Sequence, residues 1–206
     1  MEKARNVEEY IARQRAAIAA NPECGNSHYN LAVGLLGQRK FEEAEKALYE
    51  AIEHSPTMAE AYVQLGGICL SRGDLDGCLD FNTRATKVRA GFSEGYANIG
   101  FVQLQQGKVD DAIKNLQKAI AFNSNFIQAY TTLGNAYLMN GLVDESIAAN
   151  KKALKIEPEF AVAHNNLAIA YLEKGEGQKA VEHFDRAQAL GFEVAPEIAQ
   201  EIDTYR

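Results

Sequence analysis

The sequence has no apolar run that approaches the ~18 residues of a membrane-spanning helix. Its first residues are polar, and Glu8 and Glu9 stand where a secretory signal would carry an apolar segment. We therefore expect a cytoplasmic protein that does not insert into a membrane.

Cysteine is also scarce. The chain has 3 cysteines, an odd number, and no CxxC motif, which is consistent with a reducing compartment rather than a disulfide framework. Cys69 and Cys78 occupy inward positions of a helical pattern, so we expect both to be small core residues.

Basic residues are few and dispersed. The 21 Lys and Arg residues face 28 Asp and Glu residues, which gives a net charge of −7 and a sequence pI near 5.2. Nucleic-acid binding rests on a basic stripe that neutralises phosphates, and this chain has none. Anionic membranes are disfavoured for the same reason. A protein or peptide partner, neutral or basic and partly apolar, is the class of large ligand that remains.

Catalytic motifs are missing as well. The sequence contains no G-x-S-x-G, no phosphate loop, no H-E-x-x-H and no dinucleotide fingerprint. His54 and His183 have no Cys or His at ligand spacing, so no metal site is expected. The acidic pairs Glu42-Glu43 and Asp110-Asp111 are interpreted as charges at helix starts. We expect no enzymatic activity and no cofactor.

The chain does have a strict internal period, because small residues of several kinds recur along it at one fixed spacing. A period of this length, roughly 34 residues, is typical of stacked helical hairpins. Glycines at the same step mark the points where one helix must end before the next: Gly73, Gly107, Gly141 and Gly175. Six alanines keep the step: Ala17, Ala51, Ala85, Ala119, Ala153 and Ala187. So do large–small pairs: Leu31-Ala32, Leu65-Gly66, Ile99-Gly100, Leu133-Gly134 and Leu167-Ala168.

These residues resemble the tetratricopeptide repeat family, whose motif is W-x2-L-G-x2-Y, then A-x3-F, then P. His28 and His164, four periods apart, stand at the first aromatic position and are interpreted as packing rings. Repeat four carries the motif as Tyr130, Leu133, Gly134, Tyr137, Ser146, Asn150, Ala153 and Pro158. Repeat five carries it as His164, Leu167, Ala168, Tyr171, Ala180, Phe184 and Ala187.

The resemblance implies an all-α fold, a right-handed α-solenoid of stacked antiparallel helix pairs. An N-terminal half-repeat helix, residues 1–24, is expected to cover repeat one. A short C-terminal capping helix opened by Pro196, residues 195–206, is expected at the other end. The five repeats between them span residues 25–58, 59–92, 93–126, 127–160 and 161–194.

In this family the first helix of every repeat lines an inner, concave wall, and the resemblance places the candidate site there. An exposed apolar stripe on such a wall indicates an interaction surface, and Gly67 would form a notch in it. Thr131 and Val162 are also expected on the wall. The candidate peptide-binding residues are Tyr29, Asn30, Val33, Val63, Gly67, Asn98, Phe101, Leu104, Asn135, Met139, Asn166 and Ile169.

Two features of this wall have alternative interpretations. One is the leucine series Leu36, Leu70, Leu104, Leu138 and Leu172, which either contacts a ligand or is half-buried for structural reasons. The other is the amide-rich series Asn30, Gln64, Asn98, Thr132 and Asn166. Its amides either hold the backbone of a bound peptide or join neighbouring repeats by hydrogen bonds.

We conclude from the sequence that the chain is a non-enzymatic scaffold that binds a peptide segment of a partner protein in the concave groove. Two alternatives stay open. One is a structural module that assembles into homo-oligomers, and the other is an accessory subunit or assembly factor of an enzyme or secretion complex.

Overall fold

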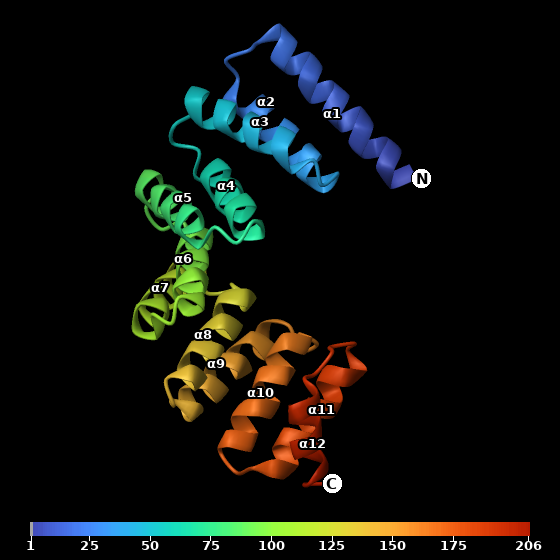
Figure 1. Cartoon of the computed structure of the whole chain (residues 1–206), viewed down its shortest axis with the longest axis vertical. Coiled ribbons are helices and arrows are strands. Elements are labelled where there is room, and N and C mark those ends of the chain that lie inside the picture. Colours follow the sequence, from blue (N-terminus) through green and yellow to red (C-terminus); the bar gives the residue numbers. More distant parts are fainter. Residues whose placement is uncertain (1) are drawn as a thin grey trace. The chain divides into compact units, whose positions relative to one another are not determined.

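The computed structural model describes residues 2–206, and it describes side chains from residue 6 onward. This part of the chain is all-α, with twelve helices in stacked antiparallel pairs (Figure 1). The helices are α1 (Glu2–Ala20), α2 (Gly25–Gly37), α3 (Phe41–His54), α4 (Ala59–Ser71), α5 (Leu75–Val88), α6 (Ser93–Gln105), α7 (Val109–Phe122), α8 (Ile127–Met139), α9 (Val143–Ile156), α10 (Ala161–Glu173), α11 (Gly177–Ala189) and α12 (Pro196–Asp203).

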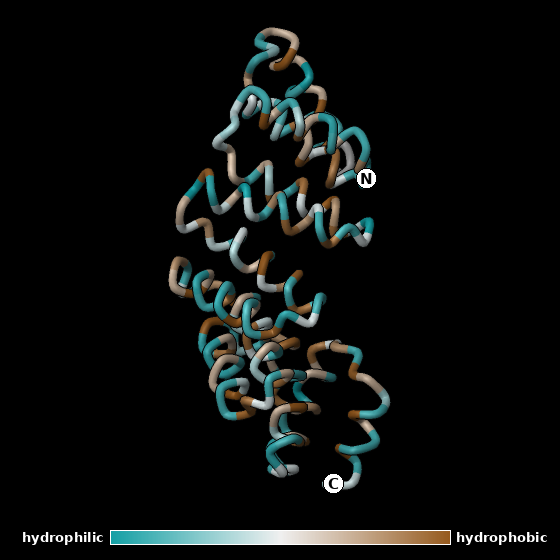
Figure 2. Tube along the Cα trace, turned by 60° about the vertical axis from the view of Figure 1, so that its left-hand side comes forward, coloured by the Kyte–Doolittle hydropathy of each residue, from teal (hydrophilic) through white to brown (hydrophobic). Residues whose placement is uncertain are grey.

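The chain divides into two compact units, residues 1–99 and 100–206, and the boundary falls inside α6. Polar and apolar residues are mixed along every helix of both units (Figure 2). Among the described residues, no helix has the length and apolar character that crossing a membrane requires. The repeat boundaries expected from the sequence stay a prediction.

The alanine series fills close contacts between helices. Five of its six members, from Ala51 to Ala187, have 0% exposed surface. In repeat two, a Cβ placed on Gly95 of α6 would lie 3.6 Å from the Cβ of Ala85, so Ala85 packs on the first helix of the next repeat. Ala17 is the exception. It is exposed because α1 packs on α2 through another face.

Glycines allow the close approach within the hairpins. A Cβ on Gly66 would lie 2.4 Å from Nδ2 of Asn82, and one on Gly134 would lie 2.2 Å from Nδ2 of Asn150. Since a glycine inside a helix costs about 1 kcal/mol relative to alanine, these contacts are the packing reason for the recurrent glycines.

The N-terminal unit begins with α1 covering repeat one, as expected for a half-repeat helix. Ile11 is buried, and its Cγ1 would lie 2.8 Å from a Cβ placed on Gly34 of α2. Val7 and Ile11 join a core that contains Leu35 and Leu48. The helix therefore hides an apolar face of α2 that would otherwise lie in water.

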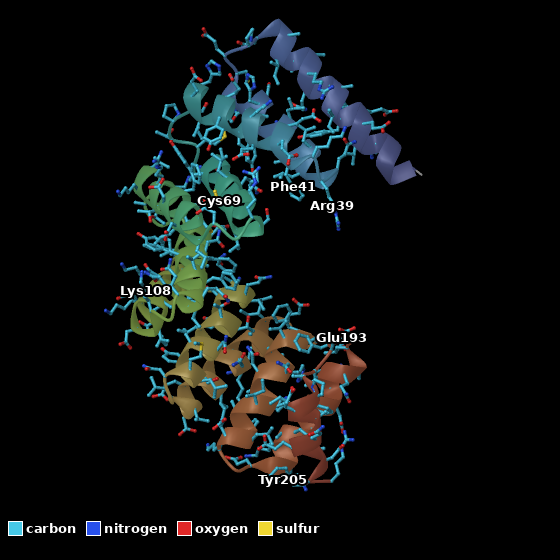
Figure 3. All side chains as sticks on the ribbon, viewed as in Figure 1. Arg39, Phe41, Cys69, Lys108, Glu193 and Tyr205 are labelled. Carbon is cyan, nitrogen blue, oxygen red and sulfur yellow. The ribbon has the colours of Figure 1, made fainter. Side chains whose placement is uncertain are left out.

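The C-terminal unit ends with α12 packed on α11. Ile202 is fully buried there. Beyond the end of α12, the ring of Tyr205 lies against Gly177, and the Nε2 group of Gln178 donates a hydrogen bond of 2.8 Å to the Tyr205 carbonyl. Figure 3 labels Tyr205 at this end of the chain. The prediction of a terminal helix opened by Pro196 is confirmed.

The turns inside the hairpins use a left-handed residue. Gly73, Gly107, Gly141 and Gly175 have φ between 72° and 77°. Repeat one has Arg39 at the same position, with φ of 59°. Its side chain projects away from the helices (Figure 3). This left-handed backbone conformation costs a residue with a Cβ about 1–2 kcal/mol, and the rest of the arginine side chain does not reduce that cost.

Arg39→Gly is therefore expected to raise the free energy of unfolding by up to about 1 kcal/mol, because glycine removes the left-handed penalty but is more flexible in the unfolded chain. Thermal or urea unfolding measures the change. Arg39→Ala, which removes the charge and keeps the Cβ, should show no comparable gain. Equal stabilisation by both variants would mean that the side chain, not the backbone, is unfavourable.

Candidate functional site

A hollow of about 160 Å³ lies on the C-terminal unit, where the first helices of three consecutive repeats contribute side chains. We call it the α6–α8–α10 hollow. Four of the candidate residues predicted from the sequence line it, together with neighbouring residues of the same three helices. Its lining consists of Phe101, Leu104, Gln105, Thr131, Thr132, Asn135, Val162 and Asn166.

The apolar part of this hollow is accessible to a ligand. Phe101 and Val162 are 38% and 37% exposed and line the same hollow, so their apolar surface faces it together. Leu104 is only 7% exposed and packs in a core with Leu116 and Leu133. The recurrent leucine is therefore structural at this position and contributes little surface to the hollow.

The polar part of the hollow offers hydrogen bonds and no charge. Asn135 is exposed, and its side-chain amide has no hydrogen-bond partner in the part of the chain that the structure describes. Thr132 donates its hydroxyl to the Gln128 carbonyl of its own helix at 2.7 Å, so its side chain is already satisfied. None of the eight described lining residues is ionisable. The arrangement is suited to binding rather than to acid–base chemistry.

Two members of the amide-rich series serve the fold. Asn98 donates from Nδ2 to Oδ1 of the fully buried Asn82 at 2.9 Å. Asn166 donates in the same way to Oδ1 of Asn150 at 3.2 Å and to the Thr131 carbonyl at 3.2 Å. The amide donors of Asn98 and Asn166 are thus engaged between repeats, which favours the structural interpretation of these two residues.

The buried partners alternate along the chain. Repeats two and four have Asn82 and Asn150 at the core position where repeats one, three and five have Leu48, Leu116 and Phe184. Each buried asparagine also donates to a carbonyl in its own helix, Asn82 to Cys78 at 2.8 Å and Asn150 to Ser146 at 2.9 Å. Burying an amide is tolerated only with such partners.

A second hollow, of about 580 Å³, lies on the N-terminal unit between α2, α4 and the end of α5. Tyr29 and Asn30 line it, as do Glu60 and Arg89, which form a bidentate ion pair with one N–O distance of 2.9 Å. The Arg89 guanidinium lowers the pKa of the Glu60 carboxyl, whereas burial raises the pKa of Tyr29. This hollow is polar, and the charged side chains that line it are already paired with each other.

Val33 lies elsewhere. It is 41% exposed and lines an apolar hollow of about 440 Å³ with Val7 and Tyr10 of α1. The sequence predicted that Val33 shares a wall with Tyr29, but the two residues line different hollows, because α1 supplies a wall that the repeat pattern does not contain.

The remaining candidates are not gathered into these hollows. Val63 and Ile169 are half-buried, so each exposes only part of its side chain. Met139 is 54% exposed at the end of α8. A Cβ on Gly67 would meet no atom within 4 Å, so this glycine lies beside open space, unlike the packed Gly66. A notch at Gly67 stays a prediction.

The histidines at the first aromatic position form hydrogen bonds to the loop that precedes their own repeat. The Nε2 groups of His28 and His164 donate to the carbonyls of Pro22 and Pro158 at 2.7 and 3.0 Å. Tyr62 donates its hydroxyl to the Pro56 carbonyl in the same way.

His164 also contacts His183, and their Nδ1 atoms lie 2.9 Å apart. The pKa of His183 is lowered, mainly by burial and then by the charge of His164.

Family models match most of this chain. One tetratricopeptide repeat model matches residues 4–53 and 131–191, a second matches residues 35–97, and a TPR repeat model matches residues 100–141. The chain belongs to the tetratricopeptide repeat (TPR) family. Proteins of this family are typically non-enzymatic scaffolds for protein interactions. No curated protein matches the sequence.

Solved structures of other proteins share the fold. MamA is 25% identical, with a TM-score of 0.67 over 78% of this chain and 94% of MamA. YrrB, described as a TPR protein with an unusual peptide-binding site, is 22% identical, with a TM-score of 0.71 over 93% of this chain and 97% of YrrB. PilF of Pseudomonas aeruginosa is 17% identical, with a TM-score of 0.77 over 89% of each chain.

Proposed function

We propose that this TPR protein is a non-enzymatic scaffold that binds an uncharged, partly apolar peptide segment of a partner protein in the α6–α8–α10 hollow. One observation carries the proposal. Phe101 and Val162 expose apolar surface in the same hollow in which Asn135 offers an amide without a partner among the described residues.

The binding mode follows from these side chains. An apolar side chain of the peptide packs between Phe101 and Val162, and burying apolar area contributes about 25 cal/mol per Å². The amide of Asn135 both donates to and accepts from a peptide group, so it fixes the peptide backbone. The absence of ionisable groups from the described lining disfavours charged residues at this point of the segment. The peptide-binding site described for YrrB supports the same class of ligand.

The test starts with the untagged, immobilised chain, which is used to capture its partners. The segment of the partner that binds is then identified. That segment is made as a synthetic peptide and titrated against the chain. The double variant Phe101→Glu/Val162→Glu should bind the peptide at least about a hundredfold more weakly, because both carboxylates enter the apolar part of the hollow. Helicity should be unchanged, since both positions are already in contact with water.

A matched control carries the same charges elsewhere. Leu142 and Ile156 are 37% and 36% exposed and lie outside the hollow. Leu142→Glu/Ile156→Glu should therefore bind the peptide as the parent chain does. Equal binding by the Phe101→Glu/Val162→Glu variant would exclude the hollow. Light scattering across a concentration series distinguishes a monomeric scaffold from a module that self-assembles.

A further inference from the structure

Three potential metal ligands meet in the first repeat. His28 of α2 and Glu50 and His54 of α3 each offer one ligand atom, and these atoms all lie within 4.8 Å of one another. No other group of three His, Cys, Asp or Glu side chains meets this condition among the described residues. The sequence spacing around His54 could not indicate this group, because His28 comes from the preceding helix.

The hydrogen bond of His28 prepares one of its nitrogens for a metal. A carbonyl only accepts, so the contact between Nε2 and the Pro22 carbonyl at 2.7 Å requires the proton on Nε2. Nδ1 then carries the free lone pair. In the equivalent residue of repeat five, His164, Nε2 faces Pro158 and Nδ1 faces α11. A backbone carbonyl on one imidazole nitrogen is the usual support of a metal ligand on the other.

Glu50 and His54 complete the group from one face of α3. Residues four apart lie one turn above each other on a helix. Glu50 Oε2 is 3.7 Å from His54 Nε2, and the His54 ring stacks on His28 with centroids 5.6 Å apart and an interplanar angle of 28°. His28 is 8% exposed, whereas the Glu50 side chain is 53% exposed, so the group is anchored on a buried side and open to solvent on the other.

We propose that His28, Glu50 and His54 bind a divalent transition-metal ion, with Zn²⁺ as the reference case. Two imidazoles and one carboxylate form a ligand set that zinc accepts, with a fourth position left for water or for a side chain of another protein. Imidazole ligands select such metals over Mg²⁺ and Ca²⁺, which prefer oxygen. The bound ion links α2 to α3 and stabilises the N-terminal unit. This site is separate from the α6–α8–α10 hollow and does not depend on it.

The experiment uses the full chain without a histidine tag, first freed of metal with a chelator. Zn²⁺ is titrated by competition with a chromophoric chelator, and Co²⁺ serves as a spectroscopic probe of the ligand geometry. We expect one ion per chain, tetrahedral visible Co²⁺ bands and a higher melting temperature with Zn²⁺.

Variants assign the ligands. His54→Gln and Glu50→Gln should each weaken Zn²⁺ binding by at least about tenfold and should leave the melting temperature of the metal-free chain nearly unchanged. Glu42→Gln at the start of α3 is the matched carboxylate control, and His183→Gln is the matched imidazole control. Both controls should bind as the parent does. Binding that survives His54→Gln but is lost in His183→Gln, or no binding of Zn²⁺ or Co²⁺ by the parent chain, would overturn the proposal.

Discussion

Ala119→Leu is expected to lower the free energy of unfolding by about 1–3 kcal/mol or more. Ala119 has no exposed surface and belongs to the alanine series. Its counterpart Ala85 faces Gly95, and the residue in that position of the following repeat, Ala129, is buried. Leucine adds three carbons to a contact with no free space, so α7 and α8 must separate.

Thermal unfolding and hydrogen exchange test this expectation. Exchange should accelerate in α7 and α8 first, because repeats contact only their neighbours. Ala121→Leu is the matched control, since Ala121 is exposed on the same helix and should change stability by less than about 0.5 kcal/mol. An unchanged melting temperature of Ala119→Leu would contradict the close contact assigned to the alanine series.

Asn98→Ala should lower the free energy of unfolding by about 1–3 kcal/mol, because it leaves the buried amide oxygen of Asn82 without its donor. The exposed Asn135 has no such partner among the described residues, so Asn135→Ala should leave stability unchanged and weaken only the binding of the peptide. This comparison separates an asparagine that serves the fold from one that faces a ligand.

A rescue variant sharpens the measurement. Between repeats three and four the same two positions hold Leu116 and Thr132, and Leu116 packs against Gly100 within repeat three. Asn82→Leu/Asn98→Thr copies that junction into the N-terminal unit and should recover most of the stability that Asn98→Ala loses. If Asn98→Ala unfolds at the parent's temperature, the hydrogen bond to Asn82 contributes nothing to stability.

The fold was predictable because the strict period of the sequence repeats small residues where helices meet and glycines where they turn. The terminal helix opened by Pro196 followed from the same local rules. Arg39 shows their limit. The period places it in a turn, but only the structure shows that an arginine adopts the left-handed conformation that glycine adopts in the other repeats.

The candidate site was only partly predictable. Phe101, Asn135 and Val162 share one hollow, as the helical register suggested. The same register could not show that Asn98 and Asn166 turn their amides toward buried asparagines, because that depends on which residue stands 16 positions earlier. Nor could it join His28 to His54, which are close only because two helices pack together. Spacing predicts the face of a helix, while the contacts across helices decide what that face can bind.

The alternation of Leu48, Asn82, Leu116 and Asn150 also limits how this chain can be lengthened or recombined. A second copy of repeat four inserted after repeat four would set Asn150 beside Thr132, which offers it no amide, whereas an inserted copy of repeats three and four together would set Asn150 beside the amide of Asn98. At this junction the building block is therefore two repeats rather than one. A chimera that inserts repeats three and four together should fold, and a chimera that inserts repeat four alone should carry an unpaired buried amide.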